Sequence, residues 1–228
     1  MTHYVIDKPP RITAPIKNTD ALFPVRRIYC IGRNYADHAI EMGHDPDREP
    51  PFFFQKNPDN LDFSGTFTYP AKSQDVHYEI ELVIAIGKGG KDISLDSAVT
   101  HVYGYALGLD MTRRDLQGEM KKMGRPWEIG KAFEKSAPMG PIIPASDIGH
   151  PVQGLIDLKV NGVLKQKGDL NQMIWKTADI ISYLSTYYEL AAGDLIMSGT
   201  PAGVGPIVKG DIMTGSISGM GELIVKVV

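Results

Sequence analysis

One stretch of the chain joins two acids to an apolar strand, and it constrains the fold more than any other: His77-Tyr78-Glu79-Ile80-Glu81-Leu82-Val83-Ile84-Ala85-Ile86. Side chains alternate across a β-strand, so Glu79 and Glu81 point to the same face. The apolar run that follows leads into the interior, where two neighbouring carboxylates repel each other and are costly to desolvate. A divalent cation between them would offset both costs. The alternative is a solvated strand end with two exposed acids.

Chain length and the pattern of apolar runs predict one α+β domain. A chain of 228 residues with 43% hydrophobic side chains can bury a full core without disulfides. Many short strand-like runs with few helices, not strictly alternating, favour α+β over a doubly wound sheet. Prolines at positions 9, 10, 15 and 24 mark residues 1–24 as a lead-in that packs on the surface. Residues 25–228 are then predicted to form a single domain.

Charge and cysteine content narrow the expected partners and location. A net charge of -3 gives no reason to expect a nucleic acid or an anionic membrane surface as partner. No stretch approaches the apolar length that a membrane span requires. The single cysteine, Cys30, stands in an apolar strand and is interpreted as a core residue of a protein from a reducing compartment. These features predict a cytoplasmic protein.

Further elements are predicted from periodicity and from the residues that begin and end them. Asn161-Gly162 is typical of a two-residue hairpin turn. Thr112 and Asp115 have the spacing of a capping box at the start of a helix. The expected strands and helices near these signals are strands over 77–86 and 102–109, and helices over 35–42, 113–123 and 177–191.

A third carboxylate stands at the end of the next predicted strand, which closes on Asp110. Glu79, Glu81 and Asp110 offer only oxygen, the donor that Mg²⁺, Mn²⁺ and Ca²⁺ prefer. Three carboxylates leave about half of an octahedron for water and substrate, as a catalytic metal site requires. The alternative is that each acid pairs with an arginine or a lysine.

Other polar residues have the spacing of a site. His38 and Glu41 are neighbours on one helix face, where the carboxylate can orient the imidazole as a proton acceptor. A solvated helix face is the alternative. Arg114 and Gln117 begin the helix after the third acid and can reach a ligand there. The glycine-rich run 199–205 lacks the lysine and hydroxyl of a phosphate-binding loop, so a nucleotide is not expected.

Five segments, in this order, resemble the short form of the fumarylacetoacetate hydrolase family. They are Gly32-Arg33-Asn34-Tyr35-Ala36-Asp37-His38, His77-Tyr78-Glu79-Ile80-Glu81, Leu109-Asp110-Met111-Thr112, Lys131, and Ser198-Gly199-Thr200-Pro201 with Gly203-Val204-Gly205. The resemblance runs from about residue 25 to the end. It implies a mixed β-sandwich roll, a homodimer, and Mg²⁺ or Mn²⁺ held by Glu79, Glu81 and Asp110. Larger members carry a fourth acid at the position of Arg33, so three protein ligands are expected here.

The resemblance also implies roles for the other residues. His38, oriented by Glu41, is the expected base that activates water, on a segment that orders over bound substrate. Lys131 is expected to add a positive field as a third catalytic residue. Arg48 is the candidate for binding a distal carboxylate. The expected substrate-binding residues are Arg33, Tyr35, Arg114, Gln117 and Thr200.

Within the family, the lead-in and the run Glu49-Pro50-Pro51-Phe52-Phe53-Phe54-Gln55-Lys56 are most similar to the fumarylpyruvate hydrolases of gentisate breakdown. The reaction that this implies is metal-dependent hydrolysis of a carbon–carbon bond in a 2,4-dioxo acid, with fumarylpyruvate giving fumarate and pyruvate. Decarboxylation or isomerisation of oxaloacetate or another 2-oxo dicarboxylate at the same site is the alternative. A further alternative is a non-catalytic, metal-dependent dicarboxylate-binding protein, against which the presence of His38 and Glu41 argues.

Overall fold

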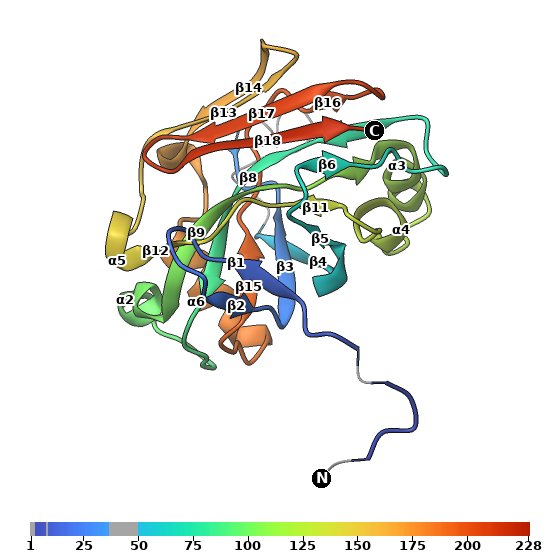
Figure 1. The fold of residues 1–228 in the computed structure, drawn as a ribbon. Coiled ribbons are helices and arrows are strands. Elements are labelled where there is room, and N and C mark those ends of the chain that lie inside the picture. Colours follow the sequence, from blue (N-terminus) through green and yellow to red (C-terminus); the bar gives the residue numbers. More distant parts are fainter. Residues whose placement is uncertain (1–2, 8, 37–49) are drawn as a thin grey trace.

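Two large β-sheets pack against each other and form the framework of the protein (Figure 1). The computed structural model describes residues 3–7, 9–36 and 50–228. In the six-stranded sheet β15 runs parallel to β3, whereas the other neighbours are antiparallel. Its strands, in spatial order, are β12 (Ile143–Pro144), β9 (Val102–Leu109), β8 (Ile80–Ile86), β15 (Asp194–Met197), β3 (Arg27–Gly32) and β4 (Phe52–Lys56).

The five-stranded sheet lies across the top of the molecule in Figure 1. Only its edge strand β6 is parallel to its neighbour. The strands, in spatial order, are β14 (Val163–Asp169), β13 (Leu155–Val160), β17 (Ile212–Ile217), β18 (Gly221–Val227) and β6 (Thr66–Phe67). The hairpin predicted at Asn161-Gly162 joins β13 to β14, and both turn residues have positive φ, 51° and 78°, as a type I′ turn requires.

Smaller elements surround the two sheets. Three small sheets consist of β10 (Thr112–Arg113), β7 (Val76–Tyr78) and β16 (Gly205–Pro206), of β1 (Thr13–Pro15) with β2 (Leu22–Pro24), and of β11 (Ala137–Pro138) with β5 (Leu61–Asp62). The helices are α2 (Leu95–Ala98), α3 (Arg114–Lys122), α4 (Glu128–Lys131), α5 (Ala145–Ile148) and α6 (Thr177–Tyr187), with 3₁₀ turns η1 (Pro58–Asn60), η2 (Val99–His101) and η3 (Leu170–Gln172). Strands outnumber helices and do not alternate with them, so the predicted α+β class is confirmed.

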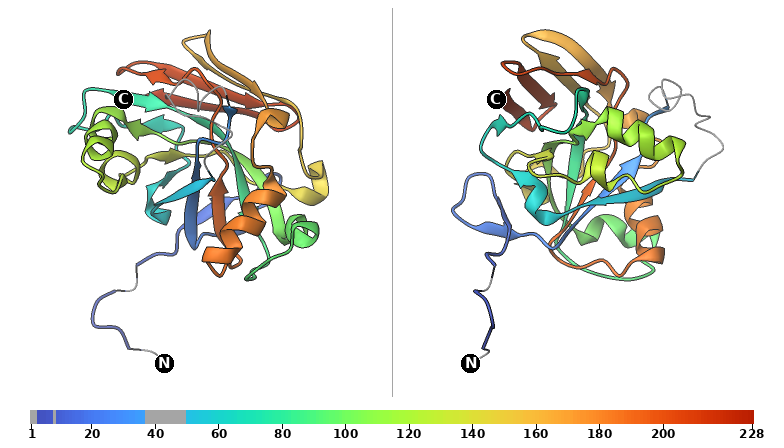
Figure 2. Two further views of the ribbon diagram at one scale, coloured as in Figure 1. Left: turned by 180° about the vertical axis from the view of Figure 1, so that it is seen from behind. Right: turned by 90° about the vertical axis from the view of Figure 1, so that its right-hand side faces the viewer.

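Strand β8 occupies the centre of the core, because all seven of its residues are buried. Ile80, Leu82 and Ile84 pack in the cluster that contains both the five-stranded sheet and α6. Val83 and Ala85 point to the opposite face, where they pack with residues of β1 and β2. The two views of Figure 2 show α6 and the β1–β2 ribbon on opposite sides of the six-stranded sheet. A strand covered on both faces explains the continuous apolar run in the sequence.

The single strand predicted over 77–86 is wrong at Glu79, which separates β7 from β8. Strand β7 pairs with β10 and β16, whereas β8 joins the six-stranded sheet. The backbone of Glu79 still contacts the large sheet, since Asp110 N donates to Glu79 O at 2.9 Å. Glu79 therefore lies at the junction of two sheets, directly beside the end of β9.

Two helix ends also differ from the prediction. The capping box is wrong, because Asp115 instead accepts hydrogen bonds from Ser73 Oγ at 2.7 Å and from Gln74 N at 2.9 Å, while Thr112 Oγ1 donates to Asp110 O. Helix α6 ends at Tyr187 rather than near residue 191. Beyond it, Leu190 exchanges two backbone hydrogen bonds with Gly90, a tertiary pairing that helical periodicity does not encode.

Part of the predicted helix over 35–42, together with His38, Glu41 and Arg48, lies outside the described residues. Within the described ranges, no helix has the length and apolar character needed to cross a bilayer.

Candidate active site

Three buried carboxylates converge where β8 and β9 meet. Glu79, Glu81 and Asp110 are 5%, 2% and 1% exposed, and one oxygen of each lies within 4.8 Å of the others. The antiparallel register of β8 and β9 pairs Glu81 with Gly108, so the residue that follows β9 arrives beside the start of β8. The predicted convergence of these acids is therefore present in the structure.

Basic side chains contact two of the three acids. Lys131 Nζ donates to Glu79 Oε2 at 2.8 Å and to Asp110 Oδ2 at 2.7 Å. Arg114 donates to Glu79 Oε1, and Lys56 Nζ lies 2.9 Å from Asp110 Oδ1. Burial opposes the charged form of Lys131, but the carboxylates of Asp110 and Glu79 outweigh it and raise the pKa of the ammonium. The alternative of paired acids thus holds for these two carboxylates.

Glu81 differs from the other two acids. No lysine or arginine of the described part of the chain lies within ion-pair distance of it, and its Oε2 accepts from Gly199 N at 2.8 Å. Burial, followed by the charges of Asp110 and Glu79, raises its pKa well above the usual range. A buried acid with like charges beside it and no cationic partner is where an added cation stabilises most.

The donor set fits a hard divalent cation. All three residues offer carboxylate oxygen, the ligand type of Mg²⁺ and Mn²⁺. Asp110 Oδ1 is buried and accepts no hydrogen bond from the described residues, although the Lys56 ammonium lies near it. Lys131 and Arg114 hold the two outer carboxylates in place without closing the cluster, because a pocket opens onto all three acids. The buried trio can therefore hold the ion that its spacing in the sequence predicts.

The loop that follows β15 contacts the acid cluster and the start of β8 through Gly199 and Thr200. Gly199 has φ of 94°, and a Cβ there would lie 2.7 Å from Asn34 Cβ, so the close approach requires glycine. Thr200 Oγ1 donates to Ile80 O at 2.8 Å. Gln166, from β14, accepts from Ile80 N at 3.0 Å and donates to Thr200 Oγ1 at 2.8 Å. A side chain of the five-stranded sheet thus fixes both the start of β8 and the glycine-rich loop.

The pocket above the acids has a polar wall and an aromatic wall. Helix α3 lines it with Arg114, Gln117 and Lys121, which recur on one helix face. The lining also contains three aromatic rings, each of which lies close to a cation. The ring–cation pairs are Phe52 with Arg33 at 5.2 Å, Phe54 with Lys131 at 5.1 Å, and Trp127 with Lys121 at 4.9 Å.

The structure brings four of the five predicted substrate-binding residues to this pocket, together with the predicted catalytic residue Lys131. The four are Arg33, Arg114, Gln117 and Thr200. Tyr35 is not among the lining residues. It lies instead in a neighbouring cavity with Lys167 and Gln172, and its buried hydroxyl has no hydrogen-bond partner in the described part of the chain.

A model of the fumarylacetoacetate hydrolase C-terminal domain matches residues 27–228. The chain belongs to the fumarylacetoacetate hydrolase family. A crystal structure of fumarylpyruvate hydrolase from Pseudomonas aeruginosa, in complex with Mn²⁺ and pyruvate, is 54% identical, covers 99% of both chains and has a TM-score of 0.97. The likeness confirms the predicted family and its sandwich-roll fold, and together with the buried trio it supports the predicted metal dependence.

Curated family members with different activities are similar to this chain. A fumarylpyruvate hydrolase from Ralstonia sp is 46% identical over 80% of this chain and 96% of that protein. A mitochondrial oxaloacetate decarboxylase from Dictyostelium discoideum is 42% identical over 86% of this chain and 90% of its own length. Membership of this enzyme family therefore does not by itself select one substrate.

The family segment Gly32-Arg33-Asn34-Tyr35 is attached to the rest of the site through Asn34, which is fully buried. Its Nδ2 donates to Ser198 O at 2.7 Å and to Trp175 O at 2.9 Å, while its Oδ1 accepts from Trp175 N at 2.7 Å. Asn34 therefore joins the end of β3 to the segments at residues 175 and 198–200.

We expect Asn34→Ala to lower the free energy of unfolding by about 2–4 kcal/mol, because the buried Ser198 O and two half-buried backbone groups of Trp175 lose their partner. Equilibrium urea denaturation measures the loss. The exposed amide Gln153 supplies a control, since Gln153→Ala should change stability by less than about 0.5 kcal/mol. A loss at position 34 as small as that of the control would contradict the proposed linkage.

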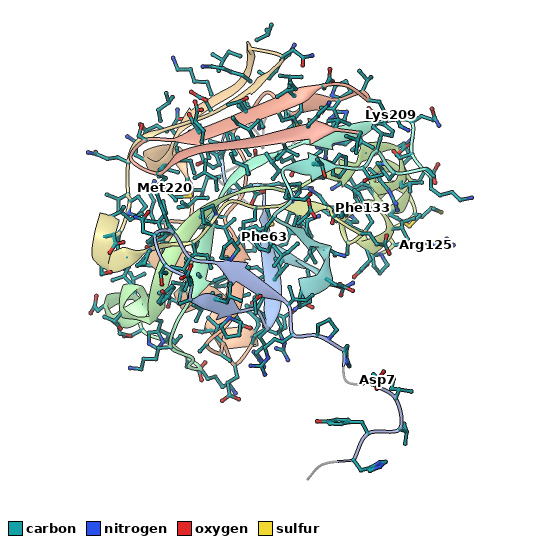
Figure 3. The ribbon with its side chains drawn as sticks, in the orientation of Figure 1. Asp7, Phe63, Arg125, Phe133, Lys209 and Met220 are labelled. Atoms are coloured by element: carbon teal, nitrogen blue, oxygen red, sulfur yellow. The ribbon has the colours of Figure 1, made fainter. Side chains whose placement is uncertain are left out.

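Sequence reasoning missed several residues of the site, among them Lys56, Lys121 and Trp127. Lys56 Nζ is fully buried and donates to Met111 O, Ser136 Oγ and Lys131 O. Lys121 has a signal in the sequence, because it follows Arg114 and Gln117 at helical spacing. Phe133 is buried, whereas Figure 3 shows Arg125 at the edge of the molecule. Neither residue lines the pocket.

Proposed function

We propose that the protein is a divalent-metal-dependent hydrolase that cleaves a carbon–carbon bond of an acylpyruvate, with fumarylpyruvate as its substrate and fumarate and pyruvate as products. The observation that carries the proposal is the buried trio Glu79, Glu81 and Asp110 at the base of a cationic pocket. Likeness to fumarylpyruvate hydrolases over nearly the whole chain supports the choice of substrate. A role in the breakdown of gentisate-type aromatic compounds follows from that substrate and is part of the proposal.

The residues of the pocket suit an anionic oxo acid. The lining carries four cationic side chains, from Arg33, Arg114, Lys121 and Lys131, besides the three carboxylates. In the proposed mode of binding, Arg114, Gln117 and Thr200 hold the carboxylate end of the 2,4-dioxo acid. Arg114 Nη1 donates to Gln117 Oε1 at 2.8 Å, which fixes the orientation of both groups before substrate enters. Tyr35 contributes to substrate binding from the neighbouring cavity.

The proposed reaction uses one water molecule, the base His38 with its partner Glu41, and the Lys131 ammonium. When bound, the dication supplies a Lewis-acidic charge that favours the enolate form of a 2-oxo acid. His38, oriented by Glu41, takes a proton from water, and the water oxygen bonds to carbon 4 of the substrate. The bond between carbons 3 and 4 breaks, and its electron pair passes to the pyruvate part. The Lys131 ammonium adds positive charge beside that part, and a returning proton at carbon 3 completes pyruvate.

The deciding experiment is incubation of the protein with Mn²⁺ and fumarylpyruvate, followed by the loss of absorbance of the conjugated enol. Acetylpyruvate and oxaloacetate are tested in parallel. We expect rapid loss with fumarylpyruvate that a chelator abolishes. Turnover of oxaloacetate alone would favour the second candidate, decarboxylation or isomerisation of a 2-oxo dicarboxylate, which the oxaloacetate decarboxylase relative supports. Binding without turnover of any of them would indicate a non-catalytic dicarboxylate-binding protein.

We expect His38→Ala to lower kcat for acylpyruvate hydrolysis by a factor on the order of 10² or more, because the proposed base that activates water is lost. Mn²⁺ affinity, measured by calorimetry, should stay unchanged. Any oxaloacetate decarboxylation serves as the internal control, because that reaction consumes no water. Unchanged hydrolysis in the variant would remove His38 from the mechanism.

Three further features complete the proposal. The chain is a single catalytic domain over residues 25–228 with a surface-packed lead-in, it forms a homodimer, and it is cytoplasmic. The family resemblance and the single buried Cys30 support these features. Light scattering of the purified protein tests the dimer.

A further inference from the structure

One wall of the pocket extends well beyond the carboxylates. Arg114, at the start of α3, contacts Glu79, whereas Lys121 lies near the end of the same helix. Seven residues of α-helix separate their Cα atoms by about 10 Å along the axis. Both residues line the pocket, as does Gln117 between them. The pocket therefore offers cationic groups at two positions, one beside the acids and one farther along α3.

Lys121 is not used to neutralise the acid cluster. Across residues 3–7, 9–36 and 50–228, no carboxylate lies within ion-pair distance of its ammonium group. Its Nζ instead lies 4.9 Å from the centre of the Trp127 ring. Trp127 packs edge-on against Phe52 with ring centres 5.1 Å apart, and a Cβ at Gly32 would clash with Phe52. The Lys121 ammonium thus lies against the ring of Trp127, which itself packs on Phe52.

We propose that Lys121, supported by Trp127, binds a second carboxylate at the far end of the substrate's acyl group. The inference rests on the proposed function and specifies its substrate class: acylpyruvates whose acyl group ends in a carboxylate, rather than neutral acylpyruvates. An extended seven-carbon diacid spans about 8 Å between its terminal carbons. Two long basic side chains whose Cα atoms lie about 10 Å apart along α3 can reach the two ends of such a diacid. The aromatic rings of Phe52, Phe54 and Trp127 in the same lining suit a planar, apolar spacer.

The protonation of Lys121 agrees with this role. Burial, followed by the positive charges of Arg114, Arg33 and Lys131, lowers its pKa to about 8, and the charge of Glu79 opposes this shift. Because neighbouring cations destabilise the charged form of Lys121, an anion that binds beside it stabilises that form. Since the ammonium form is present below this pKa and is lost above it, the affinity for a distal carboxylate should fall as pH rises through about 8.

Binding of two matched probes to the Mn²⁺-loaded protein tests the inference by calorimetry. The probes are 2-oxopimelate and 2-oxoheptanoate, which have equal length and differ only in the distal carboxylate. We expect the wild type to bind the diacid at least about 10-fold more tightly, as one charge-assisted hydrogen bond allows. Lys121→Met should remove this preference while changing the affinity for the monoacid less than about 2-fold. Lys121→Arg should retain part of the preference.

Lys122→Met is the matched control, because this neighbouring lysine is exposed and does not line the pocket. Equal binding of the two probes by the wild type, or an equal loss for both in Lys121→Met, would overturn the inference. Thermal unfolding of each variant checks that the fold is intact. The readout is separate from turnover. If the wild type cleaves no acylpyruvate, the proposed function fails, whereas the comparison of probes still decides whether Lys121 binds a distal carboxylate.

Discussion

Replacing Glu81 by glutamine is expected to abolish metal-dependent turnover, with a loss in kcat on the order of 10³ or more. Glu81 is the acid of the trio without a basic partner in the described structure, so its charge is the one that a cation neutralises directly. The amide keeps an oxygen that can accept from Gly199 N, but it carries no charge. Titration with Mn²⁺ should show affinity at least about 100-fold weaker than that of the wild type.

The metal-free variant distinguishes loss of a ligand from loss of the fold. Because the substitution removes one of three buried like charges, Glu81→Gln without metal should be at least as stable as the metal-free wild type. Glu222→Gln, at an exposed position of β18, is the matched control and should leave turnover unchanged. Treating the wild type with a chelator should reproduce the loss of activity. A Glu81→Gln protein that turns over without added metal would refute the proposed coordination.

The second large effect is expected for Lys131→Met, which should lower kcat by about 10²–10³. Lys131 is 2% exposed, and its ammonium donates to both Glu79 and Asp110. Without it, two buried carboxylates lose a shared partner, and the metal-free protein should lose about 3–5 kcal/mol of stability. A bound dication can replace part of this charge, so Mn²⁺ should restore more stability to the variant than it adds to the wild type.

Lys209→Met provides the control for this prediction, because Lys209 is exposed, and Figure 3 shows it near the surface of the molecule. Chemical denaturation of the wild type and of both variants, each with and without Mn²⁺, gives the six free energies of unfolding that the comparison needs. An unchanged kcat for Lys131→Met would remove its ammonium from the reaction. A large loss of stability that Mn²⁺ does not reduce would show that the lysine does not share its site with the metal.

The acid trio could be predicted because it depends on local rules. Strand alternation relates Glu79 to Glu81, and Asp110 ends the strand that pairs with β8. The break at Glu79 could not be predicted, because the partners of β7 come from residues 112 and 205. The capping box failed for a similar reason, since Asp115 bonds to Ser73 and Gln74, some 40 positions earlier in the chain.

The basic residues around the acids were harder to recognise. Lys131 was expected only through the family resemblance, and Lys56 was missed because a lysine at the end of an apolar run is ordinarily exposed. Its burial depends on acceptors from residues 111, 131 and 136, which only the tertiary fold assembles. Lys121 could have been found by following the spacing of Arg114 and Gln117 along α3 for one more turn.

The hydrogen bonds of Gln166 fix the part of the site that carries the carboxylates, and other segments form the rest of the pocket lining. By fixing Ile80 and Thr200, Gln166 ties the start of β8, beside the carboxylates, to both sheets, while the lining also includes residues of α3 and β4 together with Arg33, Trp127 and Lys131. Lining residues that do not contact the acids, such as Lys121 and Trp127, can change without moving an oxygen of the trio. Relatives with the same inner scaffold can therefore diverge in the acids that they accept through exchanges at a few outer positions, a route to new enzymes that leaves the reactive centre intact.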